Sequence, residues 1–263
     1  MKKILITGAN SYIGMSFEKY MAQWPEKYQV DTVDMIDGTW RQKDFSGYDA
    51  AFHVAGIAHQ KETEENAPLY YKVNRDLAVE TAKKAKADGV KQFVFLSTMA
   101  VYGMEEGAIN LATVPCPVSH YGKAKWEAEQ QMAPLNGDGF TVTIMRPPMV
   151  YGDGCKGNYQ SLVKFAEKLP IFPDYENKRS MIHIDRLCWF VKEIVDQRQD
   201  GLVLPQDEEY ACTCHMVLQI AESMGKNMRL WKLLNPAVAL AKRFTTAGKK
   251  AFGDLYYDKD SGA

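Results

Sequence analysis

The stretch Thr7-Gly8-Ala9-Asn10-Ser11-Tyr12-Ile13-Gly14 decides the fold class of this 263-residue chain. It follows a short apolar run at residues 4–7, which is typical of a buried strand, and it opens a helical pattern over residues 12–24. Gly8 permits a tight turn, small residues after it let backbone amides approach a phosphate, and Gly14 lets helix and strand pack closely. This strand–loop–helix arrangement predicts a dinucleotide-binding site.

Short apolar runs alternate with longer helical patterns beyond this loop. The runs predict strands at residues 30–35, 50–55, 92–97 and 142–146, and the patterns predict helices at residues 69–88, 121–132 and 183–198. Such alternation is typical of a parallel sheet covered by helices. We therefore expect an α/β fold, a Rossmann-type doubly wound parallel sheet.

The composition of the sequence changes after Pro147-Pro148, where glycines, prolines and aromatic residues become frequent. This change predicts a dinucleotide-binding domain at residues 1–150 and a small C-terminal substrate-binding lobe at residues 151–263, interleaved with late elements of the sheet. The Trp and Met side chains near residues 224–231 are expected in the core of that lobe.

Composition gives the chain no general electrostatic attraction to nucleic acid or to an anionic membrane, and it leaves a local basic patch open. The 32 Lys and Arg residues nearly balance the 33 Asp and Glu residues, so the net charge of −1 predicts neither a nucleic acid nor a membrane as partner. No apolar run reaches the roughly 20 residues of a membrane span. The apolar run after Met1-Lys2-Lys3 is too short for a signal peptide and is expected to be the first strand.

The cysteines give no pattern of a metal site. They are odd in number and scattered: Cys116, Cys155, Cys188, Cys212 and Cys214. Only the last two lie close together in sequence, and no second pair or His cluster accompanies them. We expect free thiols in a reducing cytoplasm and no bound metal.

The choice of dinucleotide depends on Asp34, which ends the second predicted strand 20 residues after Gly14. A carboxylate there can accept hydrogen bonds from both ribose hydroxyls, and it would repel a 2′-phosphate. This favours NAD over NADP, although the nearby Arg41 weakens the preference, so NADP stays open as the alternative.

Further short segments follow the loop in an order that resembles one family. They are Asp44-Phe45, His53-Val54-Ala55-Gly56, Asn74, F-L-S-T-M-A-V-Y-G at 95–103, Y-G-K-A-K at 121–125, R-P-P-M-V-Y-G at 146–152 and R-S-M-I-H-I at 179–184. With the loop, they resemble the motifs of the extended short-chain dehydrogenase/reductases, the NAD-dependent epimerase/dehydratases, over residues 1–190. Ser11 departs from the family pattern, which has a glycine there.

The resemblance implies an NAD-dependent enzyme acting on a nucleotide-diphosphate sugar, and it suggests a homodimer. It assigns catalysis to Tyr121, Lys125 and Thr98, and substrate binding to Thr98, Tyr121, Asn158 and Arg179. It assigns cofactor binding to Gly8, Asn10, Ser11, Tyr12, Ile13, Gly14, Asp34, Asp44, Phe45, His53, Val54, Ala55, Gly56, Asn74, Ser97, Tyr121, Lys125, Pro148 and Val150.

The proposed chemistry needs a base beside a nicotinamide. Tyr121 and Lys125 are four residues apart and share one helical face. We expect the Lys125 ammonium and the positive ring of oxidised NAD to favour the phenolate, lowering a tyrosine pKa of about 10 toward neutrality. The Thr98 hydroxyl can hold the substrate oxygen. The Arg179 guanidinium can hold a diphosphate or a surface carboxylate, and Asn158 can bind substrate or only turn the chain.

Three functions fit these residues. A nucleotide-sugar 4-epimerase would oxidise C4 transiently, with Tyr121 as base, and return the hydride to the other face of the sugar. An NAD(P)H-dependent reductase would act on a nucleotide-linked 4-keto sugar, and a redox sensor would bind the cofactor without catalysis. Asp34 favours the first, because it favours NAD. A 4,6-dehydratase is not expected, because Met99 and Ala100 stand where such enzymes carry an Asp-Glu pair.

Overall fold

The computed structural model describes residues 1–58 and 60–259 of the chain. Its backbone divides into two compact units. The first comprises Met1–Gly103, Pro115–Pro148 and His183–Pro205, and the second comprises Met104–Val114, Met149–Ile182 and Gln206–Ala263. The predicted domains 1–150 and 151–263 stay a prediction, because compactness alone does not define a domain.

The first unit contains a parallel sheet of six strands in the order β10-β6-β4-β3-β1-β2. The strands are β1 (Lys2–Thr7), β2 (Tyr28–Val33), β3 (Ala50–His53), β4 (Gln92–Leu96), β6 (Thr141–Met145) and β10 (Gly201–Val203). β3 and β4 are buried at every residue, as strands covered on both faces must be.

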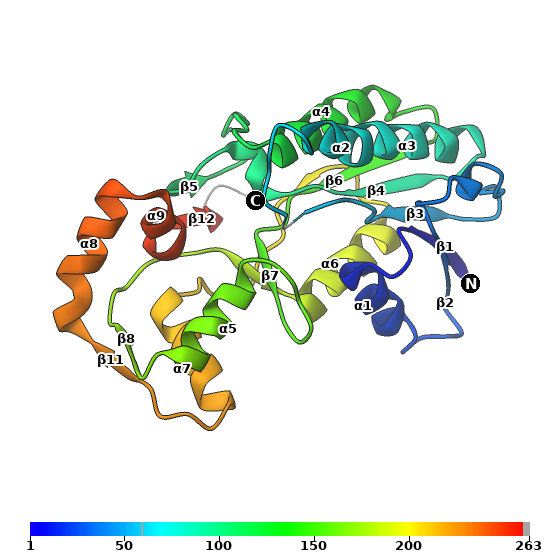
Figure 1. The fold of residues 1–263 in the computed structure, drawn as a ribbon. Coiled ribbons are helices and arrows are strands. Elements are labelled where there is room, and N and C mark those ends of the chain that lie inside the picture. Colours follow the sequence, from blue (N-terminus) through cyan, green and yellow to red (C-terminus); the bar gives the residue numbers. More distant parts are fainter. Residues whose placement is uncertain (59, 260–263) are drawn as a thin grey trace. The chain divides into compact units, whose positions relative to one another are not determined.

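Helices cover both faces of this sheet (Figure 1). They are α1 (Tyr12–Met21), α2 (Ala67–Tyr71), α3 (Ala78–Ala87), α4 (His120–Met132) and α6 (Ile184–Gln197), with short turns η1 (Thr39–Arg41), η3 (Met99–Tyr102) and η4 (Ala133–Leu135). α1 and α6 lie on one face, and α2, α3 and α4 lie on the other. The order of the strands reverses between β1 and β3, and a doubly wound sheet binds its ligand at the carboxyl ends of such strands.

The long helix predicted at residues 69–88 is present but is not uniform. Between α2 and α3 the chain forms a π-helical turn, η2 (Lys72–Leu77). Periodicity in sequence does not reveal such a turn, because one added residue shifts the apolar stripe only locally. The turn contains Asn74, which is completely buried, and π-turns of this kind are frequent at functional sites.

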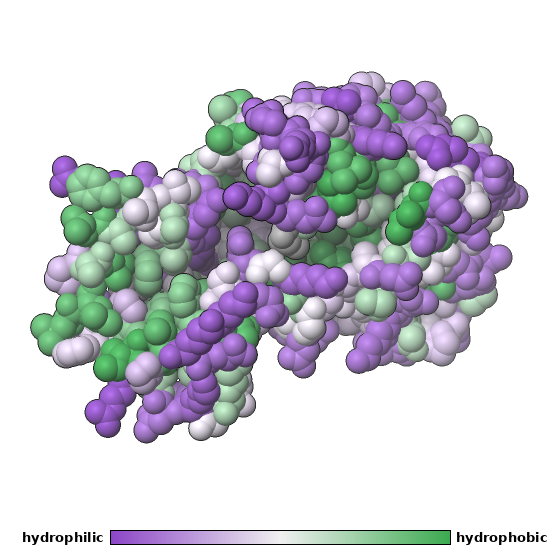
Figure 2. All heavy atoms as spheres, viewed as in Figure 1, coloured by the Kyte–Doolittle hydropathy of each residue, from purple (hydrophilic) through white to green (hydrophobic). Residues whose placement is uncertain are grey.

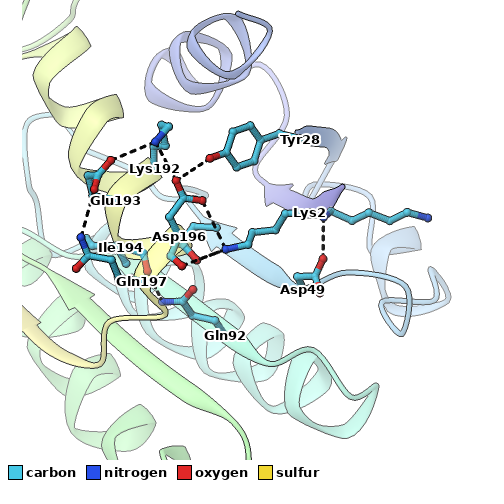
Figure 3. A network of polar contacts seen from close by, with 11 residues as sticks. Lys2, Tyr28, Asp49, Gln92, Lys192, Glu193, Ile194, Asp196 and Gln197 are labelled. Carbon is cyan, nitrogen blue, oxygen red and sulfur yellow. Dashed lines mark hydrogen bonds and ion pairs between the residues drawn. The ribbon is translucent and has the colours of Figure 1, made fainter. Parts of the chain in front are cut away.

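A polar network at the amino end of the sheet ties its first strands to α6 (Figure 3). The Lys2 ammonium donates to the carbonyl of Val195 at 2.8 Å. The Asp196 carboxylate accepts from the Tyr28 hydroxyl at 2.6 Å and from the Lys192 ammonium at 2.8 Å. This network holds the edge of the sheet that lies opposite the carboxyl ends of the strands.

The second unit is built from short elements around its own apolar core. Its helices are α5 (Tyr159–Lys168), α7 (Thr213–Ser223), α8 (Asn235–Phe244) and α9 (Thr246–Phe252), and η5 (Lys232–Leu234) precedes α8. Its strands pair two by two: β5 (Gly107–Ile109) with β12 (Leu255–Tyr257), β7 (Met149–Tyr151) with β9 (Met181–His183), and β8 (Ile171–Pro173) with β11 (Arg229–Trp231). The core gathers side chains of α5, β8 and α7, among them Leu162, Phe172 and Val217.

The expectation that the Trp and Met side chains near residues 224–231 lie in this core is wrong for two of them. Met228 is buried, but Met224 and Trp231 are 41% and 46% exposed. Side chains of a strand alternate between its two faces. On β11, Leu230 packs against the core, so the neighbouring Trp231 points to the other face.

Candidate cofactor and catalytic site

The glycine loop after β1 is pressed against the chain that follows β3. Gly8 has φ +128°, and a Cβ at this position would lie 2.7 Å from the amide nitrogen of Ala55. Asn10 adopts a left-handed conformation, with φ 63°. Ser11 caps α1, since its Oγ accepts from the amide of Gly14 at 3.1 Å. The serine that replaces the family's glycine therefore acts as a helix cap.

This loop has the features that a dinucleotide diphosphate requires. α1 begins at Tyr12, and the first amides of a helix have no partner within the helix and carry partial positive charge. Gly8 leaves no room for a side chain, so the backbone itself forms the surface of the turn. The residues present thus fit the cofactor that the sequence predicts.

Asp34 and Arg41 lie beyond the end of β2 and bear on the choice between NAD and NADP. Asp34 is exposed, and its Oδ1 accepts from the amide of Ile36 at 2.7 Å. The guanidinium of Arg41 donates to both carboxylate oxygens of Glu80, at 2.5 and 2.6 Å. Arg41 is therefore paired with an acidic side chain, which makes its guanidinium less available to bind a 2′-phosphate.

The chain after β3 is fixed beside Lys125 by Asn74. The side-chain amide of Asn74 accepts from the amide of Ile57 and donates to its carbonyl, both at 3.0 Å. A Cβ on Gly56 would lie 2.7 Å from Asn74 Oδ1 and 3.5 Å from Lys125 Nζ. The absence of a side chain at Gly56 therefore lets the chain after β3, the turn η2 and the helix α4 approach one another closely. Asn74 holds the chain after β3 in place through its hydrogen bonds to Ile57.

α4 carries Tyr121 and Lys125, and its first turn is held by two side chains. Ser119 Oγ accepts from the amide of Gly122 at 3.0 Å. The Glu62 carboxylate accepts from the amides of His120 and Tyr121, at 2.7 and 3.2 Å. A carboxylate at a helix N-terminus is favourable, and here it fixes the backbone of Tyr121. Nothing in the sequence indicated this role of Glu62.

Two of the predicted catalytic side chains, Thr98 and Tyr121, are in contact in the first unit, and Lys125 follows Tyr121 by one turn of α4. Thr98 follows β4, and its hydroxyl is hydrogen-bonded to the hydroxyl of Tyr121, a contact that lowers the pKa of this tyrosine. Lys125 is buried, and its Nζ donates to the carbonyl of Leu96, the last residue of β4, at 2.8 Å. The arrangement can hold a hydroxyl and move its proton.

In the protein itself, the pKa of Tyr121 is shifted in the opposite direction to the prediction. Burial raises the pKa of Tyr121 to about 12, against the opposing effect of Thr98. Burial lowers the pKa of Lys125 to about 7, and the Glu129 carboxylate opposes this shift. Burial disfavours both charged forms, so the expected low pKa of Tyr121 is not a property of these side chains alone.

A buried ion pair behind Lys125 was not predicted. Glu129, four residues after Lys125, accepts from Arg146 Nη2 at 2.5 Å and from the Ser97 hydroxyl. Arg146 Nη1 also donates to the Tyr102 hydroxyl at 2.8 Å. The spacing Tyr121, Lys125, Glu129 places all three on one face of α4 and was the available signal. The pair joins α4 to the ends of β4 and β6.

Two of the predicted cofactor residues lie in the core of the first unit. Phe45 and His53 are completely buried. His53 stacks on Phe93, and Thr7 Oγ1 lies 2.8 Å from its Nδ1. Burial, with the Lys125 charge, lowers the pKa of His53 to about 3, so its ring is neutral. The part of both residues in cofactor binding stays a prediction. Asp44 remains exposed, and Pro148 is buried after β6.

The remaining predicted residues belong to the second unit. Val150 lies on β7 and is half-buried, and Asn158 is exposed at the start of α5, where it makes no capping hydrogen bond. Arg179 is half-buried, and its Nη1 donates to the carbonyl of Gly253 at 3.0 Å. Their part in substrate binding stays a prediction.

Two further findings concern metals and membranes. In the second unit the ligand atoms of Cys212, Cys214 and His215 lie within 4.8 Å of one another, a grouping that sequence spacing did not indicate. Among the helices of residues 1–58 and 60–259, none has the length and apolar character needed to cross a bilayer.

Comparison with known proteins gives consistent matches. The sequence profile of the NAD dependent epimerase/dehydratase family matches residues 4–203. A UDP-glucose 4-epimerase of Vibrio cholerae is 30% identical over 267 residues, covering 89% of this chain and 79% of that protein.

Solved structures share the fold at low sequence identity. A UDP-glucuronic acid 4-epimerase from Bacillus cereus, in complex with NAD, matches with a TM-score of 0.71 and 17% identity, over 99% of this chain and 91% of that one. A dTDP-4-dehydrorhamnose reductase from Clostridium acetobutylicum matches with a TM-score of 0.71 and 19% identity, over 95% and 98%. The predicted Rossmann-type α/β fold is confirmed.

Proposed function

This chain belongs to the NAD dependent epimerase/dehydratase family, and we propose from this that it is an NAD-dependent nucleotide-sugar 4-epimerase. Its membership confirms the enzyme class that the motifs predicted. The observation that carries the proposal is the hydrogen bond between Thr98 and Tyr121, with Lys125 one helical turn further along α4 and its Nζ on the carbonyl at the end of β4. The glycine loop lies at the same edge of the same unit.

Each of these side chains has a part in moving one proton. Tyr121 takes the proton of the C4 hydroxyl as the C4–H bond breaks, which leaves a ketone at C4. When bound, NAD supplies the acceptor for the hydride and afterwards the hydride itself. Thr98 donates a hydrogen bond that favours the phenolate. Tyr121 then returns the proton to the new C4 hydroxyl of the epimer.

Lys125 combines two properties that suit this site. Its ammonium lies on the Leu96 carbonyl, and burial lowers its pKa to about 7. Glu129 opposes the loss of its charge. We assign it the ribose of the nicotinamide and, through its charge, a share in stabilising the Tyr121 phenolate.

The relatives support the reaction class and the kind of substrate. The Vibrio cholerae protein is a UDP-glucose 4-epimerase, so UDP-hexoses are the first substrates to test. Asp34 is exposed and Arg41 is bound to Glu80, which supports NAD. Asn158 and Arg179 are the residues of the second unit that we assign to the sugar and the diphosphate. The five free thiols support a reducing compartment such as the cytoplasm.

The test separates the epimerase from a reductase. Purified protein, with no cofactor added, is incubated with UDP-glucose and with UDP-galactose, and the products are identified by NMR. We expect the C4 epimer to form in both directions and mass spectrometry to find NAD retained on the protein. Tyr121→Phe is the matched control. Turnover only of a 4-keto sugar, and only with added NADPH or NADH, would assign the chain to the reductases instead.

A further inference from the structure

The charge of the chain is distributed unevenly. Seven of its 32 basic residues and none of its 33 acidic residues lie between residues 226 and 253. We call residues 226–253 the basic segment; it contains β11, η5, α8 and α9 of the second unit. The net charge of −1 for the whole chain conceals this concentration, which is the charge pattern of a surface that meets anions.

An apolar stripe runs along the same segment and faces solvent. Leu233, Ala237, Leu240 and Phe244 are spaced by four, three and four residues, so they follow one side of α8 and the turn before it. Leu233 is 72%, Leu240 61% and Phe244 71% exposed. Figure 2 shows apolar atoms at the surface where Figure 1 places α8.

This stripe is not the side of α8 that packs on the protein. The opposite side carries Val238, which is buried, and Ala241, whose backbone a side chain at Gly248 of α9 would strike. α8 thus has two apolar sides, one against α9 and one in water. Exposed large apolar side chains that adjoin one another usually mark an interaction surface.

Cations flank the stripe. Arg229, Lys232 and Arg243 are exposed, and the Arg243 guanidinium lies 5.5 Å from the ring centre of Phe244. Asp174 lies 3.9 Å from the Lys232 ammonium, while Lys242 and Lys250 pair with Glu106 and Glu105 at 3.2 and 3.5 Å. Three of the seven cations thus have acidic partners, while Arg243 places its charge beside the exposed Phe244.

We propose that the basic segment docks the enzyme on an anionic phospholipid surface, with α8 lying in the plane of the membrane. Leu233, Leu240 and Phe244 enter the boundary between headgroups and acyl chains, and Arg229, Lys232 and Arg243 contact the phosphates. Trp231, 46% exposed beside them, has the amphipathic ring that membrane interfaces favour.

Charge complementarity selects this occupant over a second copy of the chain. A symmetric contact would place the same positive face against itself, and like charges opposite one another oppose association. An anionic bilayer satisfies both the apolar stripe and the cations. The proposal is independent of the reaction assigned above.

Vesicle sedimentation of the full-length protein tests the proposal. We expect binding to vesicles of equal parts phosphatidylcholine and phosphatidylglycerol, release by high salt, and little binding to phosphatidylcholine alone. The double variant Leu240→Glu, Phe244→Glu should bind at least about tenfold more weakly. Val114→Glu is the matched control, because Val114 is 79% exposed outside the basic segment.

A second variant keeps the test decisive if the first does not fold. Lys232→Gln, Arg243→Gln removes two exposed charges without touching the stripe and should weaken binding by about fivefold for each charge. Failure of the wild type to bind anionic vesicles at low salt would overturn the proposal, as would unchanged binding by either variant. Loss of a dimer in the stripe variant, with no vesicle binding by the wild type, would assign the surface to self-association instead.

Discussion

The phenol of Tyr121 is the group through which the proposed proton transfer passes. Tyr121→Phe keeps the ring and removes only the hydroxyl, so we expect turnover to fall by about 10²–10⁴-fold. NAD affinity should stay within a few-fold of the wild type, which equilibrium titration with NAD measures. Substantial residual turnover at neutral pH would remove Tyr121 from its role.

The burial of Lys125 should affect the stability of the fold as well as the binding of the cofactor. Its pKa is about 7 in the fold and 10.5 without it. Between these values the folded chain binds fewer protons than the unfolded chain, so the free energy of unfolding rises with pH. The slope due to this one lysine approaches about 1.4 kcal/mol per pH unit.

Lys125→Met removes this titration. Urea unfolding from neutral to alkaline pH should show the wild type gaining stability relative to the variant across that window. The same pH dependence in both proteins would show that Lys125 is not buried as described. The variant should also bind NAD more weakly, and unchanged affinity would exclude the ribose contact.

Asp34 sets the cofactor preference. Asp34→Ala should weaken NAD binding by about 1–3 kcal/mol, the scale of a hydrogen bond to a charged group. It should also narrow the gap between NAD and NADP, because the repulsion of a 2′-phosphate is lost. Titration of both proteins with both dinucleotides measures this. A wild type that already prefers NADPH would contradict the assignment and favour the reductase.

At the scale of elements, three segments meet at Gly56: the chain after β3, the π-turn η2 and the helix α4. Gly56→Ala would place a methyl group 2.7 Å from Asn74 Oδ1, and Asn74 is held by two hydrogen bonds to Ile57. We expect a loss of about 1–3 kcal/mol of stability and a fall in turnover as Lys125 shifts.

Gly47→Ala is the control for this change, because a Cβ there meets nothing within 4 Å. Thermal unfolding and turnover of the two variants can be compared directly. Equal behaviour of both would show that the three segments do not depend on close approach at Gly56.

The sequence predicted the elements that have a strong hydrophobic pattern. It did not predict contacts between residues far apart in the chain. The strands predicted at residues 50–55 and 92–97 appear as β3 and β4, because a strand buried on both faces is apolar throughout. Glu62 reaches the amide of Tyr121 across 59 positions, and no local pattern records such a contact. Trp231 was expected in the core, whereas it is 46% exposed on β11.

At the scale of the whole molecule, the set of side chains limits the reaction class. Removal of water from C5 and C6 of a hexose needs an acid and a base besides the hydride machinery. Met99 and Ala100 follow Thr98 at the start of η3, and neither side chain exchanges protons. Incubation with nucleotide-hexoses should therefore yield no product lighter by one water in mass spectrometry. A 4-keto-6-deoxy product would show that other residues supply the acid and the base.

In the proposed reaction a hydride leaves C4 for bound NAD and returns to the same carbon from the other side. A nucleotide-hexose deuterated at C4 tests this directly in ordinary water. We predict that the epimer keeps its deuterium at C4, as NMR and mass spectrometry can show, and that no net oxidation or reduction of NAD accompanies its formation. Epimer without deuterium at C4, or no epimer and only cofactor-dependent reduction of a ketone, would contradict the account.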